Sequence, residues 1–166
     1  MVIREANVKD ARLFLELLKS LDTETSFMLY EPGERKSTID DIGLQIQHGL
    51  SSSSLLLVVE ANDKLIAFLS GDRGFTNRIK NSCYIVIGIL KEFNHQGLGT
   101  ALFEEMEQWA RLNHIIRLEL TVMTHNEIAI KLYQKMGFKV EGVKEKSLFM
   151  NNHYIDEYYM SKLLLS

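Results

Sequence analysis

Two glycines lie between an apolar segment and a helical pattern, at a spacing that could bind a phosphate. Residues 84–90 (YIVIGIL) indicate a buried strand, and apolar side chains recur at helical spacing after Gly97 and Gly99. Glycine allows the backbone to come close to another group. The first N–H groups of a helix lack internal partners and lie at the positive end of the helix dipole. We therefore expect this loop to hold a phosphate or pyrophosphate, with a ligand-free tight turn as the alternative.

Two common phosphate-binding motifs do not fit this loop. A dinucleotide fingerprint requires a small residue at position 102, where the chain has Leu102. A P-loop ends in Gly-Lys-Ser/Thr, but Gly99 is followed by Thr100 and Ala101. The pattern disfavours a nucleotide-binding protein of either fold.

Composition places the chain among ordinary globular proteins. The 166 residues predict a single domain, 1–166, with 46% hydrophobic and 25% charged residues and a formal net charge of −3. This charge gives no general attraction to nucleic acid. One cysteine excludes an internal disulfide, and neither a secretory signal nor a long apolar run is visible, so we expect a soluble cytoplasmic protein without membrane contact.

The elements that must position the loop alternate between strands and helices. Apolar periodicity and turn residues predict the order β-α-α-β-β-β-α-β-α-β-β, hence an α/β or α+β class with a mixed sheet. We expect Asn7 to cap the first helix, Ser37 or Thr38 to begin the second, and Gly137 to end the last. The strand at 115–123 is expected to be covered on both faces. Strands are expected at 2–6, 83–90 and 115–123, and helices after Asn7, from 37 or 38 to about 50, at 97–113 and at 127–136. We also expect a loop at 27–37, a hairpin that turns at 61–63, and two final strands around a turn at 151–152.

Two segments resemble signatures of the GNAT N-acetyltransferase superfamily. The sequence NHQGLG at 94–99 is similar to the acyl-CoA pyrophosphate loop Arg/Gln-x-x-Gly-x-Gly/Ala, with Asn94 where Arg or Gln is usual. The sequence at 124–142 resembles the second signature, an Asn, then Ala, then Leu-Tyr, then Gly-Phe. Its matching residues are Asn126, Ala129, Leu132, Tyr133, Gly137 and Phe138.

The resemblance implies a fold and an activity. The fold would be a mixed, mostly antiparallel twisted sheet of six to seven strands, with splayed central strands and about four flanking helices. The activity would be transfer of an acetyl group from acetyl-CoA to a primary amine by direct attack in a ternary complex, without a metal. The amine could belong to a small molecule, a protein or a peptide, and a homodimer is compatible with the family. The alternative is a non-catalytic acyl-CoA-binding regulatory module of the same fold.

The resemblance also assigns roles to individual residues. Tyr133 would donate a proton to the departing thiolate, which a phenol can do at neutral pH; the alternative is a core tyrosine. Asn126 would contact the pantetheine arm and would also suit a helix cap. The expected coenzyme contacts are Ile87, Gly88, Ile89, Asn94, His95, Gln96, Gly97, Leu98, Gly99, Thr100, Asn126, Ala129 and Tyr133.

The general base and the acceptor stay open at this point. An alkylammonium has a pKa near ~10.4 and must lose a proton before it attacks. No acidic residue lies between positions 83 and 90, and Tyr84 occupies the expected place. The candidates are a water chain, Glu31 or Glu34, or uptake of neutral amine, although both glutamates would equally fit a solvated loop. We expect residues 27–50 to set the acceptor; their carboxylates suit a polyamine, while amino acids, lysine side chains, protein N-termini and antibiotic amines stay open.

Cysteine and histidine give no further site. Cys83 is expected to be a small strand residue, since no histidine lies close to it in sequence. His95 and His125 lack a second ligand at metal spacing, and His114 is expected to end a helix, where a cation is favoured.

Overall fold

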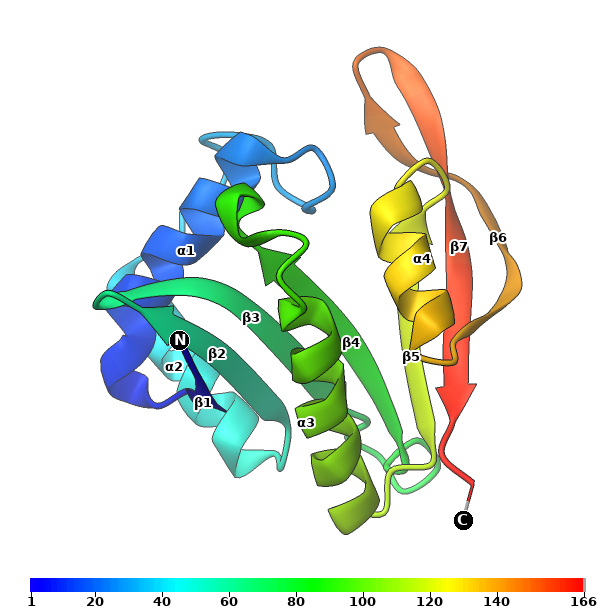
Figure 1. The fold of residues 1–166 in the computed structure, drawn as a ribbon, viewed down its shortest axis with the longest axis horizontal. Helices are drawn as coiled ribbons and strands as arrows, with labels where there is room; N and C mark the ends of the chain where they lie inside the picture. Colours follow the sequence, from blue (N-terminus) through cyan, green and yellow to red (C-terminus); the bar gives the residue numbers. More distant parts are fainter. Residues whose placement is uncertain (166) are drawn as a thin grey trace.

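Seven strands form one sheet in the computed structural model, which describes residues 1–165. The sheet order is β1-β2-β3-β4-β5-β7-β6, and all neighbouring pairs are antiparallel except β4 and β5. Figure 1 shows the strands fanning across the molecule. The strands are β1 (Val2–Glu5), β2 (Leu55–Ala61), β3 (Lys64–Arg73), β4 (Ser82–Ile89), β5 (Arg117–Met123), β6 (Lys139–Met150) and β7 (His153–Leu163).

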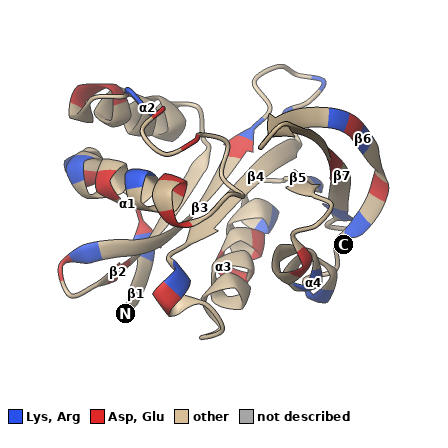
Figure 2. Ribbon diagram, turned by 90° about the horizontal axis from the view of Figure 1, so that it is seen from above, with Lys and Arg blue, Asp and Glu red and all other residues tan. Residues whose placement is uncertain are grey.

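Helices cover both faces of the sheet. On one face, α1 (Ala11–Glu24) and α2 (Ile39–Ser51) pack against β2 and β3, with Leu21 and Phe68 buried between them. On the other, α3 (Leu98–Leu112) and α4 (Glu127–Lys135) enclose a second cluster that includes Phe103 and Met106. Two short 3-10 helices, η1 (Val8–Asp10) and η2 (Lys91–Phe93), precede α1 and α3. Figure 2 shows charged residues on the outer sides of the helices and along β6, while the central strands are largely uncharged.

The central strands part in the middle of the sheet. β4 and β5 pair in parallel only from Ser82–Tyr84 to Arg117–Glu119, and no further register is formed between them. Beyond Tyr84 the two strands diverge, and the first turn of α3 lies beside the opening (Figure 1). Backbone groups of β4 that would bond β5 in a continuous sheet are therefore left for another partner.

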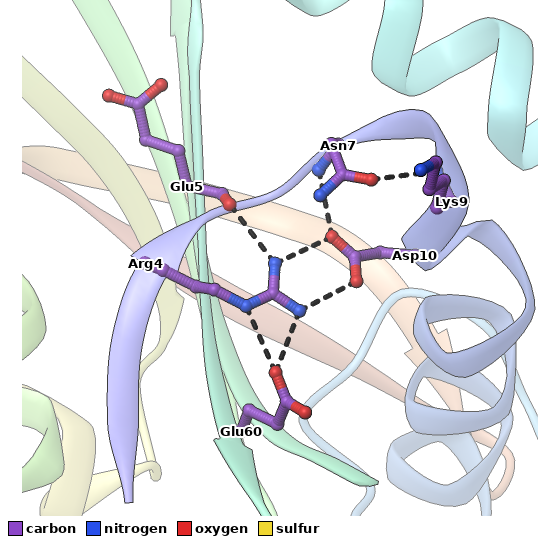
Figure 3. Close-up of polar contacts among 6 residues, drawn as sticks. All are labelled: Arg4, Glu5, Asn7, Lys9, Asp10 and Glu60. Carbon is purple, nitrogen blue, oxygen red and sulfur yellow. Dashed lines mark hydrogen bonds and ion pairs between the residues drawn. The ribbon is translucent and has the colours of Figure 1, made fainter. Parts of the chain in front are cut away.

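An ion-pair cluster fixes the N-terminal strand to the rest of the fold. The Arg4 guanidinium donates to both carboxylate oxygens of Asp10, at 2.8 and 2.7 Å, and to Glu60 of β2 at 2.9 Å (Figure 3). Asp10 also accepts from the Asn7 backbone N–H, which completes a capping box at η1. The cluster therefore joins β1, β2 and the start of α1.

The predicted fold class and element order are confirmed. Thr38 caps α2, and Gly137 follows α4 in the left-handed region at φ +91°. Asn62-Asp63 and Asn151-Asn152 have positive φ at both residues, as in the type I′ turns that favour hairpins. Within residues 1–165, no helix has both the length and the apolarity needed to cross a bilayer.

The expectation that the strand at 115–123 is covered on both faces is wrong. Its burial alternates, with Leu118, Leu120 and Val122 buried and the odd positions Arg117, Glu119 and Thr121 partly exposed. The odd-numbered side chains of β5 point to the face of the sheet that α1 and α2 cover. These two helices pack over β2 and β3, on the other side of the splay, so they leave this face of β5 partly exposed.

Candidate active site

A large cleft occupies the region where the sheet parts. Its volume is about 1030 Å³, toward the upper end of small-molecule sites. It is lined by residues of α1, the α1–α2 segment and α2, by β2, β3, β4 and β5, by one side of α4 and by the β6–β7 hairpin. The lining includes Glu24, Asp72, Tyr84, Ile87, Gly88, Ile89, Asn94, Thr121, Asn126, Ala129, Tyr133, Lys144 and Glu157.

The glycine loop presents an open helix N-terminus. Gly97 is the N-cap of α3 with φ +79°, a left-handed value that favours glycine, and no side chain within residues 1–165 caps this helix. A Cβ at position 97 would meet no atom within 4 Å, so space is open beside the backbone. The Lys135 ammonium lies 3.2 Å from the Thr100 hydroxyl and adds positive charge to that of the helix dipole. These features fit the pyrophosphate expected from the sequence.

Gly99 has a different structural reason. A Cβ there would lie 2.6 Å from a terminal methyl of Leu132 on α4. The glycine therefore favours close packing of α3 on α4, and the proposed contact of this position with a phosphate stays a prediction. Leu98 and Gly99 are both buried.

Tyr133 is both a core residue and a cleft residue. Its ring packs edge-on against Phe103, with 5.8 Å between ring centroids, and only 7% of the residue is exposed. Burial raises the pKa of the Tyr133 phenol well above its usual value, and the nearby Tyr84 adds to the shift. No hydrogen-bond partner among residues 1–165 contributes to this shift. The phenol therefore stays protonated at neutral pH and lines the cleft as a potential proton donor.

A hydroxyl pair crosses the opening between the strands. Tyr84 on β4 and Thr121 on β5 lie 2.8 Å apart through their side-chain oxygens. Tyr84 is opposite Glu119 in the last β4–β5 backbone pairing, and Thr121 lies two residues further along β5. Tyr84 therefore marks the narrow end of the splay, close to Tyr133.

Asn126 caps α4 through its side-chain oxygen, which accepts from the Ala129 N–H at 3.3 Å. Asn126 and Ala129 also line the cleft, as do Ile87, Gly88, Ile89 and Asn94. The cap is thus confirmed, while the coenzyme contact stays a prediction. Asn94 is the one loop residue in the cleft lining, and residues 95–100 lie outside it. The Gln96 amide donates to the Glu92 carbonyl.

The structure does not bring Glu31 and Glu34 to the cleft. The Glu34 carboxylate accepts from the Glu31 backbone N–H at 2.8 Å, and both residues are exposed. Neighbouring residues of the same segment do line the cleft, namely Phe27, Met28, Leu29, Tyr30 and Arg35. The segment therefore lines the cleft through largely apolar side chains and one arginine that is already paired with Asp22, and its role in binding the acceptor stays a prediction.

Sequence reasoning missed several cleft residues. Asp72 on β3 lies in register with Tyr84, and Lys144, Ser147 and Glu157 come from the terminal hairpin. The one available signal was the charge of Asp72, which interrupts the largely apolar run LIAFLSGD. The hairpin residues had no local signal, because their approach to the cleft depends on the pairing of β7 with β5.

Cys83 is buried, and burial raises the pKa of its thiol to about 12. A thiol held protonated at neutral pH is a poor nucleophile, in line with the structural role expected from the sequence. No group of three or more His, Cys, Asp or Glu side chains that could hold a metal is found in the part of the chain the structure describes.

Comparison with known proteins defines the class. Residues 15–138 match the model of the acetyltransferase (GNAT) family, so this chain belongs to that family. The family and fold expected from the two motifs are thereby confirmed.

Three proteins illustrate the similarity. L-amino acid N-acetyltransferase AaaT of Escherichia coli K12 is 39% identical over 75 residues, which are 43% of this chain and 44% of that protein's length. A solved acetyltransferase of the GNAT family from Streptococcus pneumoniae is 32% identical, with a TM-score of 0.94 over 98% of this chain and 99% of that one. The structure of yncA from Salmonella typhimurium with its cofactor acetyl-CoA is 18% identical, with a TM-score of 0.88 over 100% of this chain and 95% of that one.

Proposed function

We propose that residues 1–166 act as one N-acetyltransferase domain that moves an acetyl group from acetyl-CoA to a primary amine by direct attack in a ternary complex. The observation that carries this proposal is the placement of Tyr133, a buried phenol kept protonated, in a cleft that opens where β4 and β5 part. Family membership and the AaaT similarity support an active enzyme over a non-catalytic acyl-CoA-binding module.

The coenzyme is proposed to bind along the side of the opening that α3 and α4 flank. Backbone N–H groups of Gly97, Leu98, Gly99 and Thr100 would hold the pyrophosphate, because the helix N-terminus is uncapped and the space beside Gly97 is open. Asn94, His95 and Gln96 would border it. Backbone groups of Ile87, Gly88 and Ile89 would bind the pantetheine arm and the thioester oxygen, with Asn126 and Ala129 on the opposite wall.

Tyr133 is proposed to protonate the departing sulfur. Burial raises the pKa of this phenol, so it stays a proton donor across the neutral range. An acid positioned in this way typically contributes ~10²–10⁴-fold to the rate.

The acceptor is proposed to be a primary amine of a small molecule, a protein or a peptide. The acceptor side of the cleft is largely apolar near Phe27 and Tyr30, and it carries Asp72, Glu157 and Lys144 as polar groups. This composition suits an amine with an apolar body. A cytoplasmic location and a homodimer stay predictions.

A CoA-release screen tests the function. Purified protein, acetyl-CoA and a thiol reagent would be combined with a neutral L-amino acid, spermidine and a peptide with a free N-terminus. We expect at least one amine to release thiol, and Tyr133→Phe to lower kcat by about 10²–10⁴-fold with acetyl-CoA affinity retained. Thiol release absent with every amine, while acetyl-CoA still binds, would favour the non-catalytic module instead.

A further inference from the structure

We propose that Asp72, on β3, is the general base that takes a proton from the acceptor amine. This proposal rests on the proposed acetyl transfer and names the group that the sequence left unassigned. Sequence reasoning looked for an acid on β4, but the structure supplies one from the neighbouring strand.

Strand register places Asp72 beside the narrow end of the splay. Asp72 on β3 and Tyr84 on β4 are directly opposite in an antiparallel pair. Opposite residues project from the same face with Cβ atoms about 4.5–5.5 Å apart. Both side chains therefore reach the same part of the cleft, and Tyr84 contacts Thr121 on the far side of the opening.

The same place lies close to the proposed proton donor. Tyr84 and Tyr133 both line the cleft, and Tyr84 contributes to the raised pKa of the Tyr133 phenol. Asp72, opposite Tyr84 in the strand register, lines the same cleft. An amine held between Asp72 and Tyr133 would have a proton acceptor on one side. On the other side it would have the acid that protonates the departing sulfur.

The other carboxylates near the cleft are already engaged. Glu24 accepts from the Lys91 backbone N–H at 2.6 Å, and Glu157 accepts from the Ser147 hydroxyl at 2.8 Å. Glu119 is paired with Arg117. Among residues 1–165, Asp72 forms no ion pair within 4.0 Å and no hydrogen bond contributes to its pKa, so its oxygens are available to a ligand.

The surroundings of Asp72 favour proton uptake. Asp72 is an exposed residue that opens to the cleft, and its partial burial by the surrounding walls raises the pKa of the carboxyl above its usual value. A carboxylate with a raised pKa is a stronger base nearer to neutral pH. The titratable or charged groups around it are Arg73 on β3, Cys83 and Tyr84 on β4, Glu119 on β5, and, from other walls of the cleft, Glu24, Arg35, Lys91, Tyr133, Lys144 and Glu157.

The proton balance of the reaction closes with these two residues. The ammonium gives one proton to the Asp72 carboxylate, which releases it to the solvent of the open cleft. The nitrogen lone pair then forms the C–N bond at the thioester carbonyl, the C–S bond breaks, and sulfur takes the Tyr133 proton. After the C–N bond forms, the nitrogen carries one proton more than a neutral amide. This proton passes to the Tyr133 phenolate and restores the phenol. The products are an N-acetyl amide, free CoA and one proton in solution.

The pH dependence of Asp72→Asn tests the proposal. Thiol release would be measured between pH 6 and 10 with acetyl-CoA and each of the three amines named above. With spermidine, we expect the kcat/KM of Asp72→Asn at pH 7 to fall by about 10²–10⁴-fold and then to rise roughly tenfold per pH unit up to the pKa of the amine, because only the neutral amine can react. With the peptide, the rise should level off near the lower pKa of its N-terminus. Asp72→Glu should keep the wild-type pH profile at a lower rate, and the acetyl-CoA Kd should not change in either variant.

Glu157→Gln is the matched control, because it converts another cleft carboxylate to an amide. We expect its pH profile to keep the wild-type shape. The proposal is overturned if Asp72→Asn follows the wild-type profile at a constant offset, since that would indicate a binding or structural role, or if Glu157→Gln shows the steep profile instead. If the wild-type protein releases no thiol with any amine, the proposed function itself fails, and the Asp72 role fails with it.

Discussion

Single glycines in this protein have separate tasks, although they lie two residues apart. Gly97 adopts a left-handed conformation beside open space, whereas Gly99 has Leu132 where its Cβ would be. The same residue type therefore leaves open space beside the backbone at one position and allows helix packing at the other.

Gly99→Ala should destabilise the protein by about 1–3 kcal/mol, because the added methyl overlaps Leu132. Gly49 in α2 is the matched control, because a Cβ at this position would meet no atom within 4 Å. Gly49→Ala should stabilise the protein by up to about 1 kcal/mol, since alanine is the better helix former. Urea unfolding of both variants measures the difference.

A double-mutant cycle with Leu132→Ala identifies the cause. The Gly99→Ala penalty should shrink when Leu132 is truncated, with a coupling free energy of about 0.5–3 kcal/mol. An unchanged penalty in the Leu132→Ala background would show that the clash is not responsible.

At the scale of the elements, one capping box marks the start of η1, which runs directly into α1, and a second marks the start of α2. Asp10 and Asp41 accept from the backbone N–H groups of Asn7 and Thr38, each at 2.8 Å. Only Asp10 also binds Arg4, and its side chain is 7% exposed. Its hydrogen bond to Arg4 lowers the pKa of the Asp10 carboxyl, despite an opposing effect of burial.

Asp10→Asn should lower the free energy of unfolding at pH 7 by about 1.5–3 kcal/mol, the usual range for hydrogen bonds to charged groups. Since the folded pKa lies below the unfolded value of about 3.9, this stabilisation is present above that value. It is lost as the pH falls through the folded pKa. Urea unfolding should therefore show a larger difference from wild type at pH 7 than at pH 2. An equal difference at both pH values would contradict the charge-based explanation, and Asp41→Asn should have a smaller effect at pH 7, because Asp41 has no arginine partner.

At the scale of the whole molecule, acetyl-CoA would bridge two halves of the sheet that are paired over only three residues at β4 and β5. Acetyl-CoA at about 100 times its Kd should stabilise the folded protein by about 2.7 kcal/mol. For a chain of this size, this corresponds to a rise in Tm of roughly 5–10 °C.

Gly97→Val should abolish most of this shift by filling the space beside the helix N-terminus. Gly33→Val is the matched control, because Gly33 has nearly the same φ, +78° against +79°, and equally open surroundings. Both variants should lose similar intrinsic stability, but only the Gly33 variant should keep the acetyl-CoA shift. A full shift in Gly97→Val would show that the pyrophosphate does not lie at this loop.

Much of the fold was predictable because its determinants are local. Asn7 and Thr38 cap helices through neighbours three residues away, and the Asn-Asp and Asn-Asn turns select type I′ geometry from two residues. The two motifs likewise defined the family from short segments. The strand at 115–123 was misjudged because its exposure depends on how far α1 and α2 extend over the sheet.

By itself, the sequence determined the order of elements, the helix caps and hairpin turns, the open helix start at Gly97 and the family. Only the tertiary structure decided why position 99 favours glycine, that Glu31 and Glu34 lie outside the cleft, and that Asp72 lies opposite Tyr84. These facts depend on strand register and helix packing between segments distant in the chain. Register is set by which side chains the assembled core can bury, so no short stretch of residues contains it.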